Sequence, residues 1–231
     1  MISIVMPAHN EEGYLAAAVT PLVDALRARG LDFEVIVSEN GSTDGTAGEA
    51  EGLARSHPEL VVLRSPAADY GRALRAGFQA ASGDVVVNFD VDLVDASFLD
   101  RALERMADPA VAVVIGSKRG PGAHDRRGIG RRAVTAVFAL VMRHGFGLRA
   151  SDTHGLKALR KEPLAPLVEV CRFGADIFDT ELVLRAERAG MAVVEIPVEV
   201  SEQRPPRTPI ARRIPRTLVG LGRLWVTLRR S

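Results

Sequence analysis

The sequence predicts an α/β protein: a doubly wound, mostly parallel sheet with helices on both faces. Four short apolar runs in the first 95 residues alternate with helical patterns, at the spacing of strand–crossover–strand units. No hairpin signal separates these runs, so the strands should run parallel through right-handed crossovers. The length of 231 residues suits one large domain, and 47% hydrophobic with 26% charged residues is ordinary for a soluble globular chain.

Local signals justify each element in turn. Glycines that end helices, residues that cap them and runs of β-branched residues set the expected boundaries of the helices and strands. In chain order we expect a strand at 2–6, a helix capped by Asn10 and ended by Gly30, a strand at 33–37, a helix to Ser56, a strand at 61–63, a helix from Asp69 to Ala81, a buried strand before Asp90, a helix from about Phe173 to Gly190, and a last strand at 191–200.

The stretch from Ser82 to Asp95 combines a buried strand with two carboxylates. Residues two apart on a strand point to the same side, so Asp90 and Asp92 should converge just past its carboxyl end. Open α/β sheets bind ligands at that edge, and paired carboxylates repel unless a cation lies between them. The pattern favours a site for Mg²⁺ or Mn²⁺, which take oxygen ligands and often substrate phosphates. A solvated acidic turn is the alternative.

Cysteine content and charge narrow the class of protein. The single Cys171 excludes a disulfide framework within the chain and a cysteine-based zinc cluster, which fits a reducing cytoplasm. Met1–Pro7 lacks the basic region and long apolar run of a signal peptide. From Arg204 onward there are eight arginines and no acidic residue, whereas the preceding 203 residues carry 22 basic and 29 acidic side chains. A basic tail on an acidic body suggests an anionic partner surface.

Several segments, taken in order, resemble the signature of family 2 glycosyltransferases with the GT-A fold. They are Pro7–Glu12, Glu39–Thr46, Gly71–Gly77, Asp90–Asp92, Gly116–Arg119, Asp152–Arg160, Phe178–Leu182 and Glu195–Val198. The last four resemble the branch of dolichyl-phosphate mannose and glucose synthases and other polyprenyl-phosphate glycosyltransferases. The resemblance covers roughly residues 2 to 206. It implies a catalytic domain at 1–206. The residues that remain, 207–231, form a basic amphipathic tail that we expect at a membrane interface or packed on the body.

The resemblance implies a nucleotide pocket at the ends of the first two strands. Glu39 would accept a hydrogen bond from a base N–H, such as uracil or guanine offers, although a turn residue is the plainer interpretation. The pocket would be lined by Pro7, Ala8 and Glu11. Such enzymes must also neutralise the donor's diphosphate, and the family pattern assigns this to the next two motifs.

For the diphosphate and metal, the resemblance implies Gly71 and Arg72 at the start of a helix, where backbone N–H groups and the dipole favour anions. Tight helix packing is the alternative at Gly71 and, with nearly even weight, at Gly77. Asp90 would contact the ribose or the metal's water shell, and Asp92 would ligate the metal.

Two departures from the family pattern affect the site. The dolichyl-phosphate mannose branch often has a metal-holding Gln where this chain has Val94. Water could fill that place, Asp95 could swing in, or metal binding could be weakened. The block that begins at Asp152 is also one residue shorter than usual, which loosens the alignment around the carboxylate proposed to act as a base or to orient the acceptor.

A glycine-rich stretch at 116–130 and the helix after it resemble acceptor machinery. Five arginines and one histidine gather there: Arg119, His124, Arg126, Arg127, Arg131 and Arg132. Guanidinium groups bind phosphate bidentately, so Arg119 and Arg131 are the choices for gripping an acceptor phosphate. A solvated basic face is the alternative; nucleic acid is disfavoured because no stacking platform accompanies the cluster. The apolar helix at 131–142 is too short to span a bilayer and is either a core helix or an interfacial one beside a lipid channel.

Together these features predict an inverting, metal-dependent transferase that moves a hexose from a nucleotide-diphosphate sugar to a polyprenyl phosphate. A phosphate acceptor is already ionised, so Asp152 would orient it; with a hydroxyl acceptor Asp152 would be the general base. The alternatives are transfer to a soluble small molecule or polysaccharide, and a nucleotide-binding pseudo-enzyme. We expect a cytoplasmic protein, peripheral at the cytoplasmic face of the membrane, working as a homo-oligomer or with a separate membrane partner.

The tail carries the membrane prediction. On a helix after Pro215, the residues Leu218, Leu221, Leu224, Trp225 and Leu228 fall on one face, flanked by arginines. Such helices lie in the headgroup layer of anionic membranes. Packing of that face on the catalytic body or on a second subunit is the alternative. If the tail binds lipid, the full chain should sediment with anionic liposomes at low salt and a chain ending near Pro209 should not.

Overall fold

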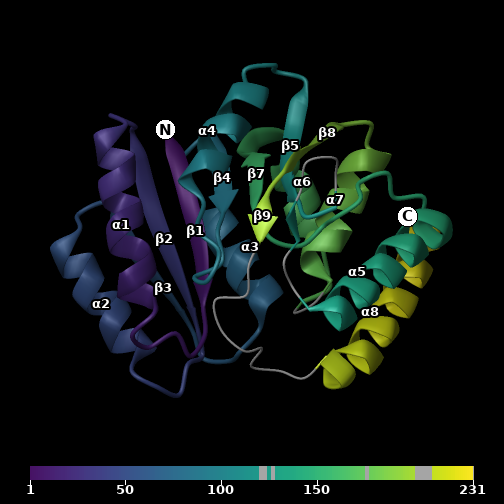
Figure 1. Ribbon diagram of the computed structural model, residues 1–231, viewed down its shortest axis with the longest axis horizontal. Helices are drawn as coiled ribbons and strands as arrows, with labels where there is room; N and C mark the ends of the chain where they lie inside the picture. Colours follow the sequence, from purple (N-terminus) through teal and green to yellow (C-terminus); the bar gives the residue numbers. More distant parts are fainter. Residues whose placement is uncertain (120–123, 126–127, 175–176, 201–209, 231) are drawn as a thin grey trace.

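The computed structural model describes residues 1–119, 124–125, 128–174, 177–200 and 210–230. Within them, seven strands form one sheet of order β3-β2-β1-β4-β7-β5-β8, and β6 pairs with β9 in a second, small sheet (Figure 1). The strands are β1 (Ile2–Ala8), β2 (Phe33–Asn40), β3 (Leu60–Ser65), β4 (Val85–Asn88), β5 (Val111–Ser117), β6 (His124–Asp125), β7 (Lys157–Arg160), β8 (Ala192–Pro197) and β9 (Glu199–Val200).

Parallel pairing dominates the large sheet, as predicted. The strand β1 pairs in parallel with β2 and with β4, β2 with β3, and β5 with β8, while β7 runs antiparallel between β4 and β5. Every residue of β1 and β5 is buried, which is why these strands are apolar runs without alternation. The carboxyl ends of β1, β2, β4 and β5 therefore share an edge with the start of β7.

Helices cover one face of the sheet through a single apolar cluster. Their apolar residues pack on side chains of β1 such as Ile4 and Met6. The helices on this face are α1 (Leu15–Ala28), α2 (Thr46–Ser56) and α4 (Ala96–Arg105).

A second cluster on the opposite face joins β1 and β2 to the remaining helices. These are α3 (Tyr70–Ala80), α5 (Ile129–Val141), the π-helical turn η1 (Met142–Phe146), α6 (Lys161–Val170), α7 (Phe178–Arg188) and α8 (Ile210–Arg230). The helices α5 and α8 lie at the same end of the molecule, outside α7 (Figure 1). Two separate clusters, one on each face, confirm the doubly wound architecture.

The tail helix α8 divides its apolar face between the body and the surface. Leu221 and Leu224 are buried in the second cluster, and a Cβ on Gly220 would lie 2.8 Å from Ile177 Cγ1. Leu218 and Trp225, predicted on the same face, are exposed. Packing on the body therefore accounts for part of the predicted face only.

Two strands of the second half of the large sheet were not predicted. Lys157–Arg160 has only four residues and no alternation, and it is a strand because β4 and β5 pair with it on both sides. Val111–Ser117 is a plain apolar run, which periodicity alone does not assign to a strand or a buried helix. Tertiary pairing, rather than a local signal, defines both.

Asn10 does not cap α1, contrary to prediction. It adopts a positive φ of 56°, and its side-chain oxygen accepts a hydrogen bond from Thr43 N at 2.8 Å. The carboxylate of Glu49, on α2, instead accepts hydrogen bonds from Gly13 N and Ala16 N, at 2.7 and 2.8 Å. A side chain distant in sequence satisfies the helix N-terminus, which no local pattern predicts.

Candidate active site

The nucleotide edge is formed where β1 and β2 end together. Ala8 lies opposite Glu39 in the strand register, and the buried side chains of Pro7 and Ala8 line this end of β1. The carboxylate of Glu39 is also buried, and its Oε1 accepts a hydrogen bond from Ser42 N at 2.6 Å. Glu39 therefore closes the turn after β2, and this contact fixes its carboxylate at the edge of the sheet.

The loops after β1 and β2 are held to each other by side chains. The backbone N–H of Glu11 donates to Thr46 Oγ1 at 2.6 Å, and Asn10 N donates to Ser42 Oγ at 3.0 Å. Glu11 itself is buried. The pocket residues expected from the sequence thus come from two loops that form one connected unit.

Asp90 and Asp92 lie in a turn, and this differs from the predicted geometry. The strand β4 ends at Asn88, and Leu93 N donates to Asp90 O at 2.9 Å, which closes a turn over the two aspartates. Val91 between them is buried in the core, whereas Asp90 is half-buried and Asp92 exposed. The two aspartates belong to one turn beyond the strand, so strand alternation does not set the directions of their carboxylates.

A tyrosine hydroxyl holds the carboxylate of Asp90 in place. The hydroxyl of Tyr70 donates to Asp90 Oδ1 at 2.9 Å. Burial raises the pKa of Asp90 above its ordinary value; Tyr70 and Lys157 oppose this rise, while Asp179 and Asp92 add to it. Burial likewise raises the pKa of Tyr70 well above its ordinary value, so the phenol remains a donor.

The donor set of the turn fits a divalent cation that also binds a diphosphate. The described residues hold no group of three or more His, Cys, Asp or Glu side chains arranged for a metal. Two aspartates after the end of β4 would supply part of a coordination shell, and phosphate and water oxygens would supply the rest. Asp92 adds to the rise in the pKa of Asp90, and a cation between the two carboxylates would relieve that repulsion.

Asp95 does not supply the metal ligand that is missing at Val94. The carboxylate of Asp95 caps α4, where Oδ1 accepts hydrogen bonds from Ser97 N at 2.8 Å and Phe98 N at 3.0 Å. An N-cap carboxylate with these partners is committed to the helix. Two of the alternatives at this position therefore remain: a water molecule takes the place of the ligand, or the metal binds more weakly.

The start of α3 is packed and capped. A Cβ on Gly71 would lie 2.8 Å from Phe178 Cβ, and one on Gly77 would lie 2.3 Å from Val5 Cγ1. Asp69 caps the helix by accepting from Arg72 N at 3.0 Å. These contacts give both glycines a packing role, and they use a backbone N–H that was expected to face the diphosphate. The side chain of Arg72 is exposed.

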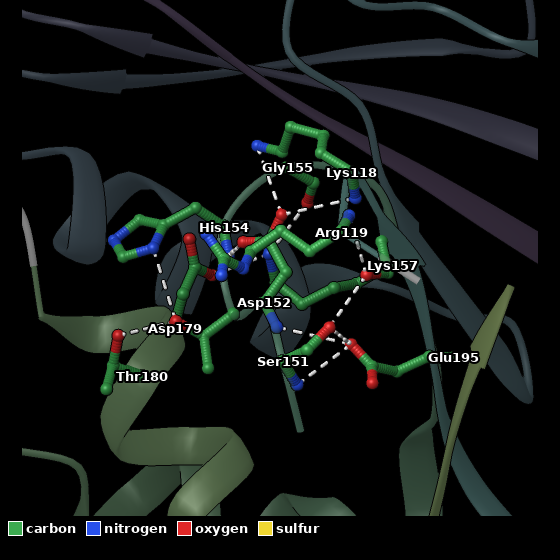
Figure 2. Close-up of polar contacts among 12 residues, drawn as sticks. Lys118, Arg119, Ser151, Asp152, His154, Gly155, Lys157, Asp179, Thr180 and Glu195 are labelled. Atoms are coloured by element: carbon green, nitrogen blue, oxygen red, sulfur yellow. Dashed lines mark hydrogen bonds and ion pairs between the residues drawn. The ribbon is translucent and has the colours of Figure 1, made fainter. Parts of the chain in front are cut away.

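Asp152 is buried and forms an ion pair with Lys118, next to the end of β5 (Figure 2). Its Oδ2 lies 3.5 Å from Lys118 Nζ, and its Oδ1 accepts from His154 N at 3.1 Å. Glu195, on β8, accepts from Ser151 N at 3.0 Å and Asp152 N at 3.2 Å. A carboxylate bound on both oxygens is placed to orient neighbouring groups.

His154 connects this loop to α5. Its ring lies edge-on to Phe138 with centroids 5.4 Å apart, and Thr153 Oγ1 is 3.2 Å from its Nδ1. Burial lowers the pKa of His154, and Asp179 and Asp152 oppose that effect. The imidazole is therefore mainly neutral at pH 7.

A buried ion pair was not singled out from the sequence. Lys157 Nζ lies 3.2 Å from Asp179 Oδ1 and donates to Gly155 O at 2.7 Å, and both charged side chains are almost inaccessible (Figure 2). The sequence signal for this pair was a lysine, Lys157, next to the apolar residues of a short segment. Its meaning depended on β7 pairing with β4, which the sequence does not reveal.

Glu181 has a structural role. Its Oε2 accepts from Arg172 N at 2.9 Å and Phe173 N at 3.1 Å, and its Oε1 accepts from Arg185 NH2 at 2.8 Å. These partners use the carboxylate to hold the segment before α7.

The predicted acceptor arginines are only partly described. Arg119 is exposed just beyond β5, and its backbone N–H donates to Ser117 Oγ at 3.2 Å. The side chain of Arg131, on α5, lies outside the described residues, as do those of His124, Arg126 and Arg127. The structure thus brings Arg119 and Lys118 together at the end of β5.

Comparisons with known proteins agree with this geometry. The model of glycosyl transferase family 2 matches residues 3–166. Glycosyltransferase AglD of Haloferax volcanii is 33% identical over 211 residues, covering 86% of this chain and 32% of that protein. Dolichyl-phosphate beta-glucosyltransferase ALG5A of Trichomonas vaginalis is 25% identical over 213 residues, covering 87% of this chain and 66% of that protein. The chain thus spans about a third of the first relative and just under two thirds of the second.

Among solved structures, the glucosyl-3-phosphoglycerate synthase of Mycobacterium tuberculosis, in complex with Mn²⁺, UDP and glucosyl-3-phosphoglycerate, has a TM-score of 0.64 at 22% identity. The match covers 97% of this chain and 76% of that one. It confirms the GT-A-like fold expected from the sequence. With the family model spanning most of its length, the chain belongs to glycosyl transferase family 2.

Proposed function

We propose that the protein transfers a hexose from a nucleotide-diphosphate sugar, bound with Mg²⁺ or Mn²⁺, to a polyprenyl phosphate at a membrane surface. The observation that carries the donor half is the Asp90–Asp92 turn, which lies at the same sheet edge as Glu39. The crystallised mycobacterial synthase, which holds Mn²⁺ and UDP, supports the same donor class.

The donor half assigns separate roles to three carboxylates. Asp92, exposed at the tip of the turn, binds the cation directly, and Asp90 binds it or its water shell. When bound, the cation neutralises the charge that develops on the departing nucleoside diphosphate. Glu39 accepts a hydrogen bond from the base with the oxygen that does not bind Ser42 N.

The acceptor half uses the basic end of β5. Lys118 and Arg119 attract the acceptor phosphate, and Asp152 keeps the Lys118 ammonium in place through the 3.5 Å pair. A phosphate oxygen attacks the anomeric carbon as the bond to the donor's diphosphate breaks, so that the nucleoside diphosphate leaves with the bonding electrons. Because the attacking phosphate is already ionised, no general base is needed.

Apolar side chains on α5 and α8 support a lipid acceptor. In the part of the chain that the structure describes, eight of the twelve exposed large apolar residues lie on these two helices. They are Val134, Val137, Leu140, Val141, Leu218, Val219, Trp225 and Val226. No helix among the described residues is long and apolar enough to cross a bilayer. An apolar surface of this kind with arginines around it suits the headgroup region of an anionic membrane.

A groove beside α8 adds to that support. Its volume is about 560 Å³, and Phe173, Val219 and Val226 line it together with Arg172 and Arg223. Two guanidinium groups at the rim of an apolar groove suit an amphiphile with an anionic head. The dolichyl-phosphate glucosyltransferase among the relatives is named for an acceptor of that chemistry.

A phosphorylated soluble acceptor is the second candidate. It is favoured by the structural likeness to glucosyl-3-phosphoglycerate synthase, whose product is a glucosylated phosphoglycerate. The basic end of β5 would serve either acceptor, because both carry a phosphate. The exposed apolar helices have no role in this alternative.

The donor is identified by a thermal-shift screen of UDP-, GDP- and TDP-sugars, with and without Mn²⁺. A ligand that binds the native state raises its melting temperature. We expect one nucleotide to raise it further with Mn²⁺ than without. If none does so at saturating concentrations, the metal-dependent donor site is refuted.

A further inference from the structure

A buried series of polar contacts runs from the metal-side carboxylate into the core. Tyr70, on α3, donates to Asp90 Oδ1 at 2.9 Å, and Asn88 Nδ2 lies 3.5 Å from both the Tyr70 hydroxyl and the Gly155 carbonyl. Lys157 donates to the same carbonyl at 2.7 Å. These residues belong to α3, β4, β7 and the loop before β7, so distant parts of the chain meet beneath one aspartate.

The centre of this series is built at a cost in stability. Asn88 is buried, and its Oδ1 has no hydrogen-bond partner among the described residues. A cavity of about 20 Å³, enough for one water molecule, lies beside Asn88, Lys157 and Asp179. An unpartnered buried carbonyl and a buried ion pair both disfavour the folded state relative to apolar residues of the same shape. A fold selected for stability alone would fill this position with an apolar side chain.

We propose that Tyr70 is a positioning residue, which fixes the carboxylate of Asp90 for the donor's metal–diphosphate complex, and that Asn88 holds Tyr70 in place. The inference rests on the proposed function. The hydroxyl occupies Oδ1 of Asp90, so the proposal assigns Oδ2 to the metal–diphosphate complex. Residues that orient a ligand in this way commonly change metal affinity by about 10- to 100-fold.

The test compares Tyr70→Phe with Tyr14→Phe. The chain has two tyrosines, and Tyr14 is exposed at the start of α1, so the control removes a hydroxyl that takes no part in the series of contacts beneath Asp90. Mn²⁺ binding is measured from the loss of the free-ion electron paramagnetic resonance signal, with UDP and, separately, with GDP present. Binding of each nucleotide without metal is measured by calorimetry.

We expect Tyr70→Phe to weaken Mn²⁺ binding about tenfold or more while metal-free nucleotide binding stays within about twofold. Tyr14→Phe should change neither. A folded Tyr70→Phe protein that binds Mn²⁺ as the wild type does overturns the inference. Failure of the wild type to bind Mn²⁺ with either nucleotide overturns the proposed function instead, so the two failures are distinct.

Asn88→Leu provides a second test with a different signature. Leucine removes the unpartnered carbonyl and occupies space beside the cavity, so the melting temperature should stay level or rise. Mn²⁺ binding should nevertheless weaken, because Tyr70 loses its neighbour. Unchanged Mn²⁺ binding in this folded variant would contradict the role assigned to Asn88, and a fall in both melting temperature and binding would mark it as structural.

Discussion

At the scale of single residues, the charged side chains on the acceptor side form ion pairs within the protein itself. Asp152 pairs with Lys118, and Lys157 pairs with Asp179, all four with little or no solvent contact. Buried ion pairs contribute little net stability, and removing one partner is costly. Asp92, by contrast, is exposed, and its position in the turn suits direct contact with a cation.

Replacing Asp92 with Ala should abolish turnover and remove the Mn²⁺-dependent part of nucleotide binding, because the cation loses a direct ligand. Asp84→Ala is the matched control. That carboxylate is exposed at the opposite end of β4, and it contacts the N-terminal amine at 3.5 Å. Calorimetry with and without Mn²⁺ checks binding. An Asp92→Ala enzyme working at the wild-type rate, or full wild-type activity in excess EDTA, would rule out the metal site.

Replacing Asp152 with Asn keeps the shape and removes the charge that pairs with Lys118. For a carboxylate that positions Lys118, turnover should fall about tenfold while donor affinity stays near normal. A general base would contribute about 10²- to 10⁴-fold. Steady-state kinetics and donor calorimetry together separate these roles. Lost donor affinity with unchanged turnover would place Asp152 in the donor half of the reaction.

At the scale of elements, the loops after the strands make the site, and caps hold them. Glu49 serves the start of α1, Asp69 the start of α3, and Asp95 the start of α4. Each cap fixes a loop that carries candidate site residues. Stability and substrate binding should therefore be separable by mutation in this part of the fold.

Asp95→Ala makes that separation explicit. The loss of an N-cap costs about 1 kcal/mol of unfolding free energy. Because Asp95 is committed to α4, Mn²⁺ binding should stay within about twofold of the wild type. Urea unfolding and the Mn²⁺ titration measure the two quantities. A loss of Mn²⁺ affinity comparable to that of Asp92→Ala would mean that Asp95 replaces the missing ligand at Val94 after all.

Cys171, between α6 and α7, reports on the segment before α7. Burial, together with the charge of Glu181, raises the pKa of its thiol to about 12. At pH 8 the folded protein should therefore contain almost no thiolate and should react with a thiol reagent only on unfolding. The rate of colour formation with Ellman's reagent across a urea series checks this. Rapid reaction in the native state would show that the junction opens.

The first half of the fold was predictable because each strand there is an apolar run ended by a capping or glycine signal. The second half was not, because Lys157–Arg160 becomes a strand only through pairing with β4 and β5. For the site, the motif residues were found, but Tyr70 was missed, and Lys157, inside the Asp152–Arg160 segment, was assigned no role. Their contacts join residues 20 or more positions apart, and no sequence pattern records them.

At the scale of the whole molecule, the donor edge and the exposed apolar helices belong to different parts of the surface. The loop that contains Asp152 and His154 connects them, through the contact of His154 with Phe138 on α5. A lipid acceptor would enter along α5 and α8 and present its phosphate at the end of β5. Under the proposed function, membrane contact would be linked to catalysis by position alone.

Liposome binding tests the apolar surface. Removing the tail at Pro209 would uncover core residues that Leu221 and Leu224 now cover, so point substitutions are the cleaner test. Val137→Ser with Trp225→Ser should lower binding to anionic liposomes at least tenfold, from the apolar area lost. Val61→Ser, an exposed valine on β3, is the matched control. If the double variant binds anionic liposomes as strongly as Val61→Ser does, α5 and α8 do not form the membrane contact.

The most direct measurement is transfer of radiolabelled sugar from the nucleotide donor that the thermal-shift screen identifies. Polyprenyl phosphate in anionic vesicles and 3-phosphoglycerate are offered in parallel, each with Mn²⁺ and with EDTA. We predict label in the lipid fraction with Mn²⁺ and none with EDTA. Label on 3-phosphoglycerate alone would contradict the lipid acceptor, and the absence of both transfer and donor hydrolysis would contradict catalysis altogether.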